Sequence, residues 1–519
     1  MMPSMTAPRP HFDEDACYLA LQARDARFDG NFFTDVTSTG IYCRPTCRVR
    51  TPKRENCRFF AHAAQAEHAG FRPYLRCRPE LAPKCMVLAP SAAQSAWSIQ
   101  DASTSLAHQA AHLMDQGEMG SIVALAQHID ISERHLRRIM ATNFGVTASH
   151  YLQTCRLLCA KQLLTDTAIP VSQVAALSGY TSVRRFNAAL LENYGFTPTG
   201  LRRTQRTALH TSTAAGITVN LAYRPPYDVQ AMLSFFAARH LTETEVIQRD
   251  GTTPNLAKTW ALTHAGRTLR GWLVARFVPA RLQVALTISD SLAKVLPHLM
   301  ARTRHWLNLD ADPCAINSVI GAAFPGGDGL RLLGSVDGFE LAERAILGQQ
   351  VTVCAARTLC ERLVSRFGEP LDTPLTGLTR LFPTAERLAC ASGDELGQLR
   401  TVKQRQNAIV ALASAVSQGT LPLHPGANPV STHAALTALP GIGDWTARYI
   451  CMRALAWPDA FPAADVGLPT ALGLQDHPHR ARAALAASQA WHPWRSYAVI
   501  RAWAKLSPAL SPRRIIQQT

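Results

Sequence analysis

The chain has 519 residues, of which 47% are apolar, and it carries a formal net charge of +16 with a pI of about 9.6. At roughly 100–200 residues per domain, this length predicts about three globular domains. The chain contains no apolar run long enough to cross a bilayer and no signal core, so we expect a cytoplasmic protein without membrane contact. Basic residues are spread over both halves of the chain, which favours a polyanionic partner such as nucleic acid. On charge alone, a merely basic protein is an equally good interpretation.

The 13 cysteines are an odd number, and most stand singly in apolar, helix-like stretches, as Cys354, Cys360 and Cys451 do. Single thiols in such stretches are typical of reduced, buried side chains in a cytoplasm. The pattern therefore argues against a disulfide framework.

Shifts in composition and periodicity divide the chain into six segments. An N-terminal part rich in Cys, Arg and Pro is followed by a linker that turns helical, a densely helical part, a small-residue linker, a part with strand-like alternation and a long helical part. The predicted bounds are 1–90, 91–118, 119–206, 207–216, 217–290 and 291–519.

A cluster of cysteines marks the first segment. Cys43 and Cys47 flank a tight Arg-Pro-Thr turn, and Cys77 follows downstream. Thiolates two to four residues apart, joined by a later one, suit a tetrahedral zinc ion, although a C-x3-C pair alone is weak evidence. The surrounding sequence resembles the N-terminal domain of Ada-type methylphosphotriester repair and response proteins over about residues 10–90. The segments that carry this resemblance are STGIYCRPTCRVR, KRENCRFF and AGFRPYLRCRPEL.

That resemblance implies four zinc-binding cysteines, of which the first accepts a methyl group from a DNA phosphotriester. Cys43 stands at the first position, and Cys47 and Cys77 are two further ligands. A zinc-bound thiolate stays nucleophilic at neutral pH, and its methylation removes a negative charge beside DNA. The sequence departs from the family pattern at Tyr74, which replaces the third cysteine. The fourth ligand is then one of four candidates: Cys57, Cys85, His62 or water.

Two similar helix–turn–helix patterns follow. In SIVALAQHIDISERHLRRIMATNFG, Leu125 faces inward and Ser132 is a natural N-cap, and VSQVAALSGYTSVRRFNAALLENYGFTP repeats the pattern with Gly179 in its turn. Polar residues on the second helix of such a unit meet base edges and phosphates in a major groove. The candidates are Arg134, Arg137, Arg138, Arg184, Arg185 and Asn187. Any one of them could belong to a solvated helix face, but two matching clusters favour DNA contact. The stretch resembles the AraC-type DNA-binding domain.

The strongest pattern is LPGIGDWTARYI, from Leu439 to Ile450. Its Pro-Gly-x-Gly turn, with Gly441 and Gly443, frees backbone N–H groups to face a phosphate without reading sequence. The pattern resembles a helix-hairpin-helix. Four further segments lie around it, in an order that resembles 3-methyladenine DNA glycosylase II over nearly all of 218–519. They are LAYRPPYDVQAMLSFFAARH, RAILGQQVTV, FPAADVGLPTAL and WHPWRSYAVIRAW.

The resemblance to the glycosylase implies roles for six residues. The catalytic aspartate maps to Asp465, and the intercalating wedge maps to Gln349 and Gln350, where the family usually has a bulky apolar residue. The aromatic residues of the base pocket map to Trp445, Tyr449 and Trp503. Without this context, Asp465 would be interpreted as a helix N-cap.

The residue types suit the chemistry. A target base leaves the helical stack and is received by flat aromatic walls, whose electron-rich faces attract the positive charge of an alkylated purine. One carboxylate near the anomeric carbon then stabilises the oxocarbenium-like sugar and guides water. The hairpin carries Asp444 and Trp445 where bifunctional relatives carry a Schiff-base lysine, so we expect no strand cleavage. No cysteine follows Cys451, which excludes the C-terminal iron–sulfur cluster of some relatives.

We therefore expect a multidomain α+β protein with a small zinc-stapled domain and an all-α tandem helix-turn-helix domain. The last part would be a glycosylase, with a small α/β subdomain before an all-α helix-hairpin-helix bundle. The predicted function is excision of alkylated bases by a monofunctional DNA-3-methyladenine glycosylase II fused to a methylation-sensing transcription regulator. The alternatives are an activator with an inactive glycosylase half, and a repair enzyme that its helix-turn-helix units merely tether to DNA. The expected partners are double-stranded DNA and, for an activator, RNA polymerase, and we expect a monomer.

Overall fold

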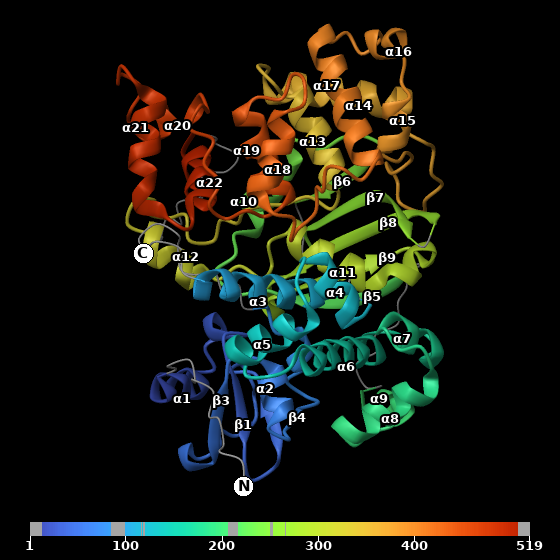
Figure 1. Cartoon of the computed structure of the whole chain (residues 1–519), viewed down its shortest axis with the longest axis vertical. Helices are drawn as coiled ribbons and strands as arrows, with labels where there is room; N and C mark the ends of the chain where they lie inside the picture. Colours follow the sequence, from blue (N-terminus) through green and yellow to red (C-terminus); the bar gives the residue numbers. More distant parts are fainter. Residues whose placement is uncertain are drawn as a thin grey trace.

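The computed structural model is an elongated molecule with the N-terminal parts at one end and the C-terminal helices at the other, with a twisted sheet between them (Figure 1). None of the helices in the described parts of the chain combines the length and the apolarity needed to cross a membrane. The residues that the structure describes are 13–84, 99–115, 117, 120–205, 216–249, 253–264 and 266–506.

The N-terminal unit is a small four-stranded sheet in the order β3-β1-β2-β4, in which β1 pairs antiparallel with β2 and β3, and β2 pairs parallel with β4. Gly40, with φ +65°, makes the turn between β1 and β2, and the packed rings of Phe33 and Tyr42 lie in the core beside the sheet. The register brings Cys43 to the end of β2. The elements are α1 (Glu14–Ala23), β1 (Phe33–Val36), β2 (Ile41–Cys43), β3 (Cys57–Phe60), α2 (Ala63–His68) and β4 (Arg72–Pro73).

Seven helices form the second unit, and the two predicted helix–turn–helix patterns are confirmed as the pairs α4/α5 and α7/α8, joined by the long helix α6. Hydroxyl side chains cap the second helices: Ser132 accepts from the His135 N–H of α5, and Ser182 from the Arg185 N–H of α8. Left-handed Gly145 and Gly195 end them. The helices are α3 (Ile99–Asp115), α4 (Ile122–His128), α5 (Glu133–Phe144), α6 (Ala148–Asp166), α7 (Val171–Leu177), α8 (Val183–Tyr194) and α9 (Pro198–Gln205).

A five-stranded antiparallel sheet follows, in the order β5-β9-β8-β7-β6. The three predicted strands are confirmed as β5, β8 and β9, whereas β6 and β7 were not predicted. In β7 the buried residues Lys258 and Thr259 interrupt the alternation of polar and apolar side chains that would reveal a strand. The elements are β5 (Ile217–Ala222), α10 (Val229–Ala237), β6 (Glu245–Gln248), β7 (Asn255–His264), β8 (Arg267–Val278), β9 (Gln283–Ile288) and α11 (Leu296–Trp306).

The remaining helices gather around two apolar cores, one shared by α13, α14, α17 and α19 and one shared by α12 and α22. The helix α19 contributes to both cores, and it lies between the two groups of helices (Figure 1). These helices are α12 (Pro313–Ile320), α13 (Gly338–Leu347), α14 (Val353–Phe367), α15 (Ala385–Ala389), α16 (Gly393–Gly397), α17 (Lys403–Ser417), α18 (Pro429–Thr437), α19 (Asp444–Ala454), α20 (Gly467–Ala471), α21 (Arg480–Ala487) and α22 (Arg495–Leu506).

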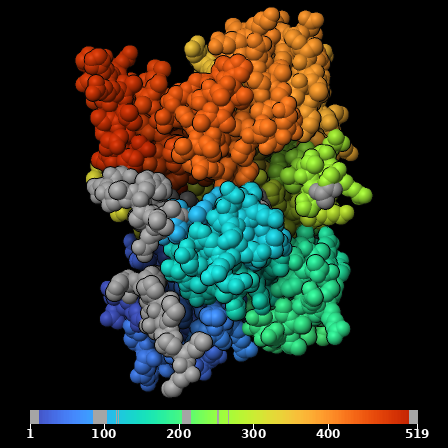
Figure 2. Space-filling view, viewed as in Figure 1, coloured from blue at the N-terminus to red at the C-terminus, as the bar shows by residue number. Residues whose placement is uncertain are grey.

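One fully buried arginine joins the N-terminal unit to the C-terminal half. The guanidinium of Arg224 donates to the backbone carbonyls of Asp29 at 2.7 Å and Pro83 at 3.1 Å, and to the carbonyl of Asp310 at 2.7 Å. Because a buried guanidinium is stable only when its donors are satisfied, these carbonyls fix the two parts against each other. In the space-filling view, the helix-turn-helix unit likewise packs against its neighbours above and below (Figure 2).

A buried ion cluster fixes the helix-turn-helix unit in the same way. Arg78 contacts Glu80 at 2.9 Å and Asp166, at the end of α6, at 2.6 Å. Lys161 of α6 pairs with the other oxygen of Glu80, and the side chains of both residues are inaccessible to solvent. Asp166 also accepts from the backbone N–H of Asn220 in β5 at 2.9 Å. The cluster therefore joins all three parts of the chain.

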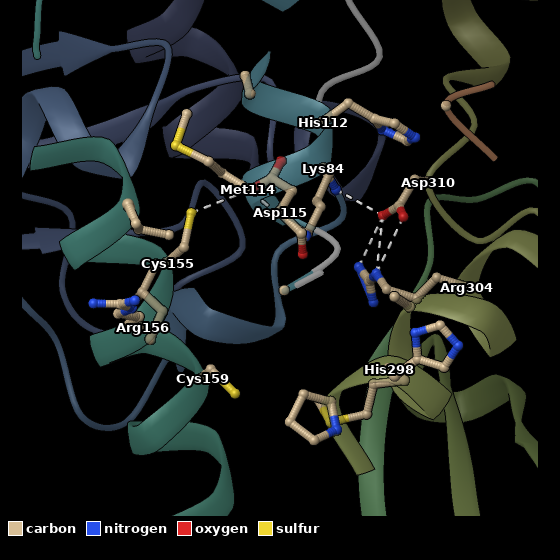
Figure 3. A pocket seen from close by; sticks show the side chains of 18 of the residues that line it. Lys84, His112, Met114, Asp115, Cys155, Arg156, Cys159, His298, Arg304 and Asp310 are labelled. Atoms are coloured by element: carbon tan, nitrogen blue, oxygen red, sulfur yellow. Dashed lines mark hydrogen bonds and ion pairs between the residues drawn. The ribbon is translucent and has the colours of Figure 1, made fainter. Parts of the chain in front are cut away.

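A cavity of about 1170 Å³ remains where these parts meet (Figure 3). Two ion pairs lie in its wall, Lys84 with Asp115 at 3.6 Å and Arg304 with Asp310 at 2.9 Å. Burial lowers the pKa of His298 in its wall to about 3. The cavity shows that the packing between the units is looser than the packing within each core.

Candidate functional site

Asp465 lies in the loop between α19 and α20, where four N–H groups converge on its carboxylate. Its Oδ2 accepts from the indole N–H of Trp445 at 3.1 Å, and its Oδ1 accepts from the indole N–H of Trp503 at 3.1 Å. The backbone N–H groups of Gly467 and Leu468 donate to Oδ1 at 3.0 and 3.1 Å. Donors from three helices, α19, α20 and α22, thus fix the orientation of this carboxylate.

The structure is compatible with both interpretations of Asp465, as a catalytic carboxylate and as a helix-capping residue. Its bonds to Gly467 and Leu468 cap the first turn of α20, as an N-cap does. An ordinary N-cap, however, needs no indole donors from other helices, and here Trp445 comes from α19 and Trp503 from α22. The side chain is half-buried, so it retains access to solvent.

The three predicted aromatic residues lie together beside this carboxylate. Trp445 and Tyr449 are one turn apart on α19, and their rings stack with centroids 5.4 Å apart and an interplanar angle of 11°. Trp503 is tilted by 42° to Tyr449 at 6.2 Å. Flat, half-buried ring faces of this kind can receive an unstacked base.

The predicted hairpin joins α18 to α19. Gly441 has φ +78°, and a Cβ there would lie 3.1 Å from the Cβ of Ala408 and 3.2 Å from the carbonyl oxygen of Gln404, so only glycine fits without strain. Gly443 is the N-cap of α19 and has open space around it. The backbone N–H groups at the start of α19 are therefore accessible to a phosphate group.

Gln349 and Gln350 form the turn between α13 and α14, and the structure separates their roles. The amide of Gln349 donates to the carbonyl of Gly441 at 2.9 Å and to the hydroxyl of Thr446 at 3.1 Å, which ties this turn to the hairpin. Gln350 is exposed and has a left-handed backbone with φ +52°. It is the residue of the pair that projects from the surface.

Two arginines behind the aromatic cluster were missed in the sequence. Arg453, one turn after Tyr449, is 5% exposed and donates to the Tyr449 hydroxyl at 2.6 Å. Burial alone raises the pKa of Tyr449, but the charges of Arg453 and Arg239 more than offset it, so the pKa lies below its usual value. Burial lowers the pKa of Arg239 to about 10. The i, i+4 spacing of Tyr449 and Arg453 was the available signal.

The predicted metal ligands converge in the N-terminal unit. The sulfur atoms of Cys43, Cys47 and Cys77 lie within 4.8 Å of one another. Hydrogen bonding to the other two thiols, together with burial, raises the pKa of Cys43, and burial raises that of Cys77 to about 12. Hydrogen bonds from the thiols of Cys43 and Cys77 lower the pKa of Cys47 to about 3. Three sulfur donors at this spacing fit three corners of a tetrahedral zinc site.

The structure narrows the choice of fourth ligand. Among the described residues, neither Cys57 nor His62 belongs to the group of mutually close ligand atoms. The Cys57 thiol donates to the carbonyl of Lys53 at 3.4 Å, and His62 packs against Phe144. Tyr74 lies near the thiols, whose charges contribute, after burial, to raising its pKa. Cys85 lies outside the described residues.

Access to the thiols is through a small cavity of about 170 Å³, which Cys43 and Cys47 line together with Thr34, Val49 and Arg50. Cys43 itself is only 4% exposed. Arg44, the next residue, is buried in an ion pair with Asp29 and donates to the carbonyl of Cys77 at 3.3 Å. The arginine thus holds the Cys43 and Cys77 segments together.

The predicted DNA-contacting side chains of the second unit are all exposed. They lie on α5 and α8, the second helix of each pair, and point away from the buried residues Leu136 and Phe186. The exposed residues are Arg134, Arg137, Arg138, Arg184, Arg185 and Asn187. Each pair thus presents a polar, mostly basic face on the helix that enters a major groove in this motif.

Four family models match the chain in the order of these units. The metal binding domain of Ada matches residues 16–80, and a helix-turn-helix domain matches 125–204. The AlkA N-terminal domain matches residues 218–337, and the HhH-GPD superfamily of base excision DNA repair proteins matches 344–490.

Whole-chain comparison gives the same order. The DNA-3-methyladenine glycosylase 2 of Escherichia coli (strain K12) is 34% identical over 285 residues, which is 54% of this chain and 95% of that protein. The bifunctional transcriptional activator/DNA repair enzyme Ada of the same strain is 34% identical over 143 residues, 28% of this chain and 36% of that one. The probable bifunctional transcriptional activator/DNA repair enzyme AlkA of Mycobacterium tuberculosis (strain CDC 1551 / Oshkosh) is 34% identical over 506 residues, covering 96% of this chain and 97% of that protein. With all four units in place and the whole length matched, the chain belongs to this AlkA family of bifunctional transcriptional activator/DNA repair proteins.

Proposed function

We propose that the C-terminal half is a monofunctional DNA glycosylase that releases 3-methyladenine and related alkylated bases, with Asp465 as its catalytic carboxylate. The observation that carries the proposal is the convergence of two indole N–H groups on this carboxylate from the aromatic residues beside it. A base that rests against Trp445 and Tyr449 would have its sugar beside Asp465, whose carboxylate can balance positive charge there.

The mechanism follows from these positions. The hairpin at Gly441 and Gly443 grips the backbone, Gln350 enters the space left by the flipped nucleotide, and the aromatic faces hold the base. When the bond from C1′ to the base nitrogen breaks, its electron pair leaves with the base. The Asp465 carboxylate stabilises the oxocarbenium-like sugar and directs the water that attacks C1′.

The absence of a nucleophilic amine at the hairpin supports hydrolysis alone. Asp444 is paired with Arg448 at 2.8 Å, and neither it nor Trp445 can form a Schiff base. We therefore expect an intact abasic strand as the product.

The test is release of 3-methyladenine from methylated duplex DNA by the full chain and by Asp465→Asn. The Asp476→Asn variant is the matched control, since Asp476 is an exposed carboxylate whose hydrogen bond is to Gln475. Release by the wild type and the control, with loss in Asp465→Asn, is the expected result. A folded wild type that releases no base would refute the proposal and leave the rival, an activator with an inactive glycosylase half.

We further propose that the N-terminal unit binds one zinc ion through Cys43, Cys47 and Cys77 and accepts a methyl group on Cys43. Bound zinc keeps a coordinated thiol deprotonated at neutral pH. The Cys43 thiolate attacks the methyl carbon, a sulfur–carbon bond forms, and the phosphotriester oxygen leaves as a phosphodiester anion. The donor set supports this proposal, because three thiols lie together and two of them, Cys43 and Cys47, line a cavity.

Transfer is tested with DNA carrying a radiolabelled methylphosphotriester. Label is expected on the wild type and not on Cys43→Ala, while Cys57→Ala, outside the thiol group, should remain labelled. Reporter activation after methylating stress then separates a regulator from a tether. If the protein is a regulator, the wild type activates the reporter and Cys43→Ala does not. If the helix-turn-helix units only tether a repair enzyme to DNA, neither protein activates the reporter. We propose that the regulator acts as a monomer that contacts RNA polymerase.

A further inference from the structure

The wedge turn, formed by Gln349 and Gln350 between α13 and α14, has a backbone that must be held in place. Gln350 has φ +52°, in the left-handed region that residues with a side chain rarely adopt. Such a conformation persists only where neighbouring groups fix the chain. Because Gln350 itself is exposed, those groups act on the backbone of the turn through Gln349.

The side chain of Gln349 ties the wedge turn to the hairpin and to the helix of the aromatic cluster. Its half-buried amide donates to the carbonyl of Gly441, within the hairpin, at 2.9 Å and to the hydroxyl of Thr446 at 3.1 Å. Thr446 is 4% exposed and follows Trp445 on α19. One amide therefore sets the place of the wedge turn relative to both the proposed backbone grip and the proposed base pocket.

Arg405 holds the same turn from α17. It is the third residue of that helix, and its guanidinium donates to the backbone carbonyl of Gln349. A hydrogen bond from a charged donor is stronger than one between neutral groups. The first turn of α17 also lies against the hairpin, since a Cβ at Gly441 would be 3.2 Å from the carbonyl oxygen of Gln404. The start of α17, the hairpin and the wedge turn thus meet at Gln349.

We propose that Gln349 and Arg405 are positioning residues that hold Gln350 in its left-handed conformation, at a fixed place between the hairpin and the aromatic cluster. The side chain of Gln350 then enters the base stack from a backbone that is already ordered, so less conformational entropy is lost on binding. Without the two residues, the hairpin still grips the DNA backbone, but the flipped nucleotide returns to the stack more readily. This inference rests on the proposed glycosylase.

The test measures single-turnover release of 7-methylguanine by the full chain from two duplexes, with the lesion opposite cytosine in one and opposite a stable abasic analogue in the other. Gln349→Met removes both hydrogen bonds of the amide, so release from the paired lesion should fall about tenfold. An unpaired base leaves the stack at less cost, so release from the second duplex should stay within about threefold of the wild type. Gln162→Met, which loses a buried amide bond of 2.7 Å to the carbonyl of Asn220, is the control that should change neither rate.

Arg405 is tested with matched changes of charge. Arg405→Met should reproduce the loss on the paired lesion, and Arg405→Lys, which keeps a donor for the carbonyl of Gln349, should restore part of it. Lys403→Met removes one exposed charge from the same turn of α17 and should leave the ratio of the two release rates unchanged.

Gln350→Gly separates positioning from support of the fold. Glycine adopts the left-handed backbone without strain, so this change removes only the wedge side chain. Release from the paired lesion should fall. Adding Gln349→Met to Gln350→Gly should then slow release no further, because a positioning residue acts only through the group that it positions.

The remaining outcomes decide between the inference and the function on which it rests. An equal loss on both duplexes in Gln349→Met overturns the inference, as does a further loss when Gln349→Met is added to Gln350→Gly. No loss on the paired lesion in either single variant also overturns it. All of these results leave base release by the wild type in place. A wild type that releases 7-methylguanine from neither duplex would instead refute the proposed glycosylase.

Discussion

Asp465 and Cys43 are the two residues proposed to react, and both are held by close neighbours, but the neighbours are of opposite kinds. Four N–H donors converge on the carboxylate of Asp465, so the fold itself supplies the partners for its negative charge. The neighbours of Cys43 are two more thiols, which cannot all be ionised side by side without a cation. The comparison teaches that folding alone supplies the partners of the first site, whereas the proposed zinc ion would supply them at the second.

Chelation is the strongest way to break this comparison. Removing zinc from the full chain should unfold the sheet β1–β4, because structural zinc contributes on the order of 10 kcal/mol to small domains. Release of 3-methyladenine should change less than twofold. Hydrogen exchange of the sheet and base release, measured on one sample, check both statements. Parallel loss of the two would mean that the docking through Arg224 makes the centres one unit.

Asp465→Asn tests the other side of the comparison. The amide keeps the size of the carboxylate but loses its charge, and its NH₂ group faces an indole N–H donor. The rate of base release should fall about 10²–10³-fold, the effect of losing one preorganised charge-stabilising group. Zinc content should be unchanged. A fall of less than tenfold in single-turnover assays would contradict the role of Asp465.

Trp445→Phe sharpens the comparison by removing one donor while retaining a ring. The variant loses the 3.1 Å bond to Asp465 but keeps an aromatic face for the base. We expect about a tenfold slower release, which corresponds to about 1.4 kcal/mol in the activation free energy. The dissociation constant for DNA with an abasic analogue should change little. A large loss of affinity with an unchanged rate would assign Trp445 to binding alone.

A smaller effect is expected from acid. Burial lowers the pKa of His62 to about 4 and that of His298 to about 3, whereas both titrate near 6.5 when unfolded. The unfolded chain therefore binds more protons between about pH 6.5 and 4, so stability is present above pH 6.5 and is lost as the pH falls. The melting temperature should drop by a few degrees from pH 7 to pH 5. His62→Phe should flatten this slope, and an unchanged slope would show that His62 is not the sensor.

The candidate site residues could be predicted from the sequence where they lie in short motifs. The thiols at 43, 47 and 77 and the hairpin around Gly441 could be found because their spacing is fixed by local geometry. The position of Asp465 within its motif did not reveal that two indoles donate to it, since Trp503 follows 38 residues later and meets it only in the fold. The position of Arg239 behind the aromatic cluster could not be predicted either, because this residue follows α10, far from α19 in the sequence.

The buried polar residues were the least predictable. Lys258 lies in the interior of β7 only because Glu245 and Glu340 pair with it at 2.9 and 2.7 Å. Arg224 reads as a surface residue until the carbonyls that it joins are known. The burial of such residues depends on partners that are distant in the sequence. The periodicity of polar and apolar residues along the chain does not indicate these partners.

The cavity between the units has a mechanical consequence. Hydrostatic pressure favours states that eliminate internal void volume, and the 1170 Å³ hollow lies at the junction and outside the cores. Compression should therefore drive water into the junction and separate the three units before any single unit unfolds. The hydrogen bonds from Arg224 to the carbonyls of Pro83, Lys84 and Asp310 would act as the pivot of that separation.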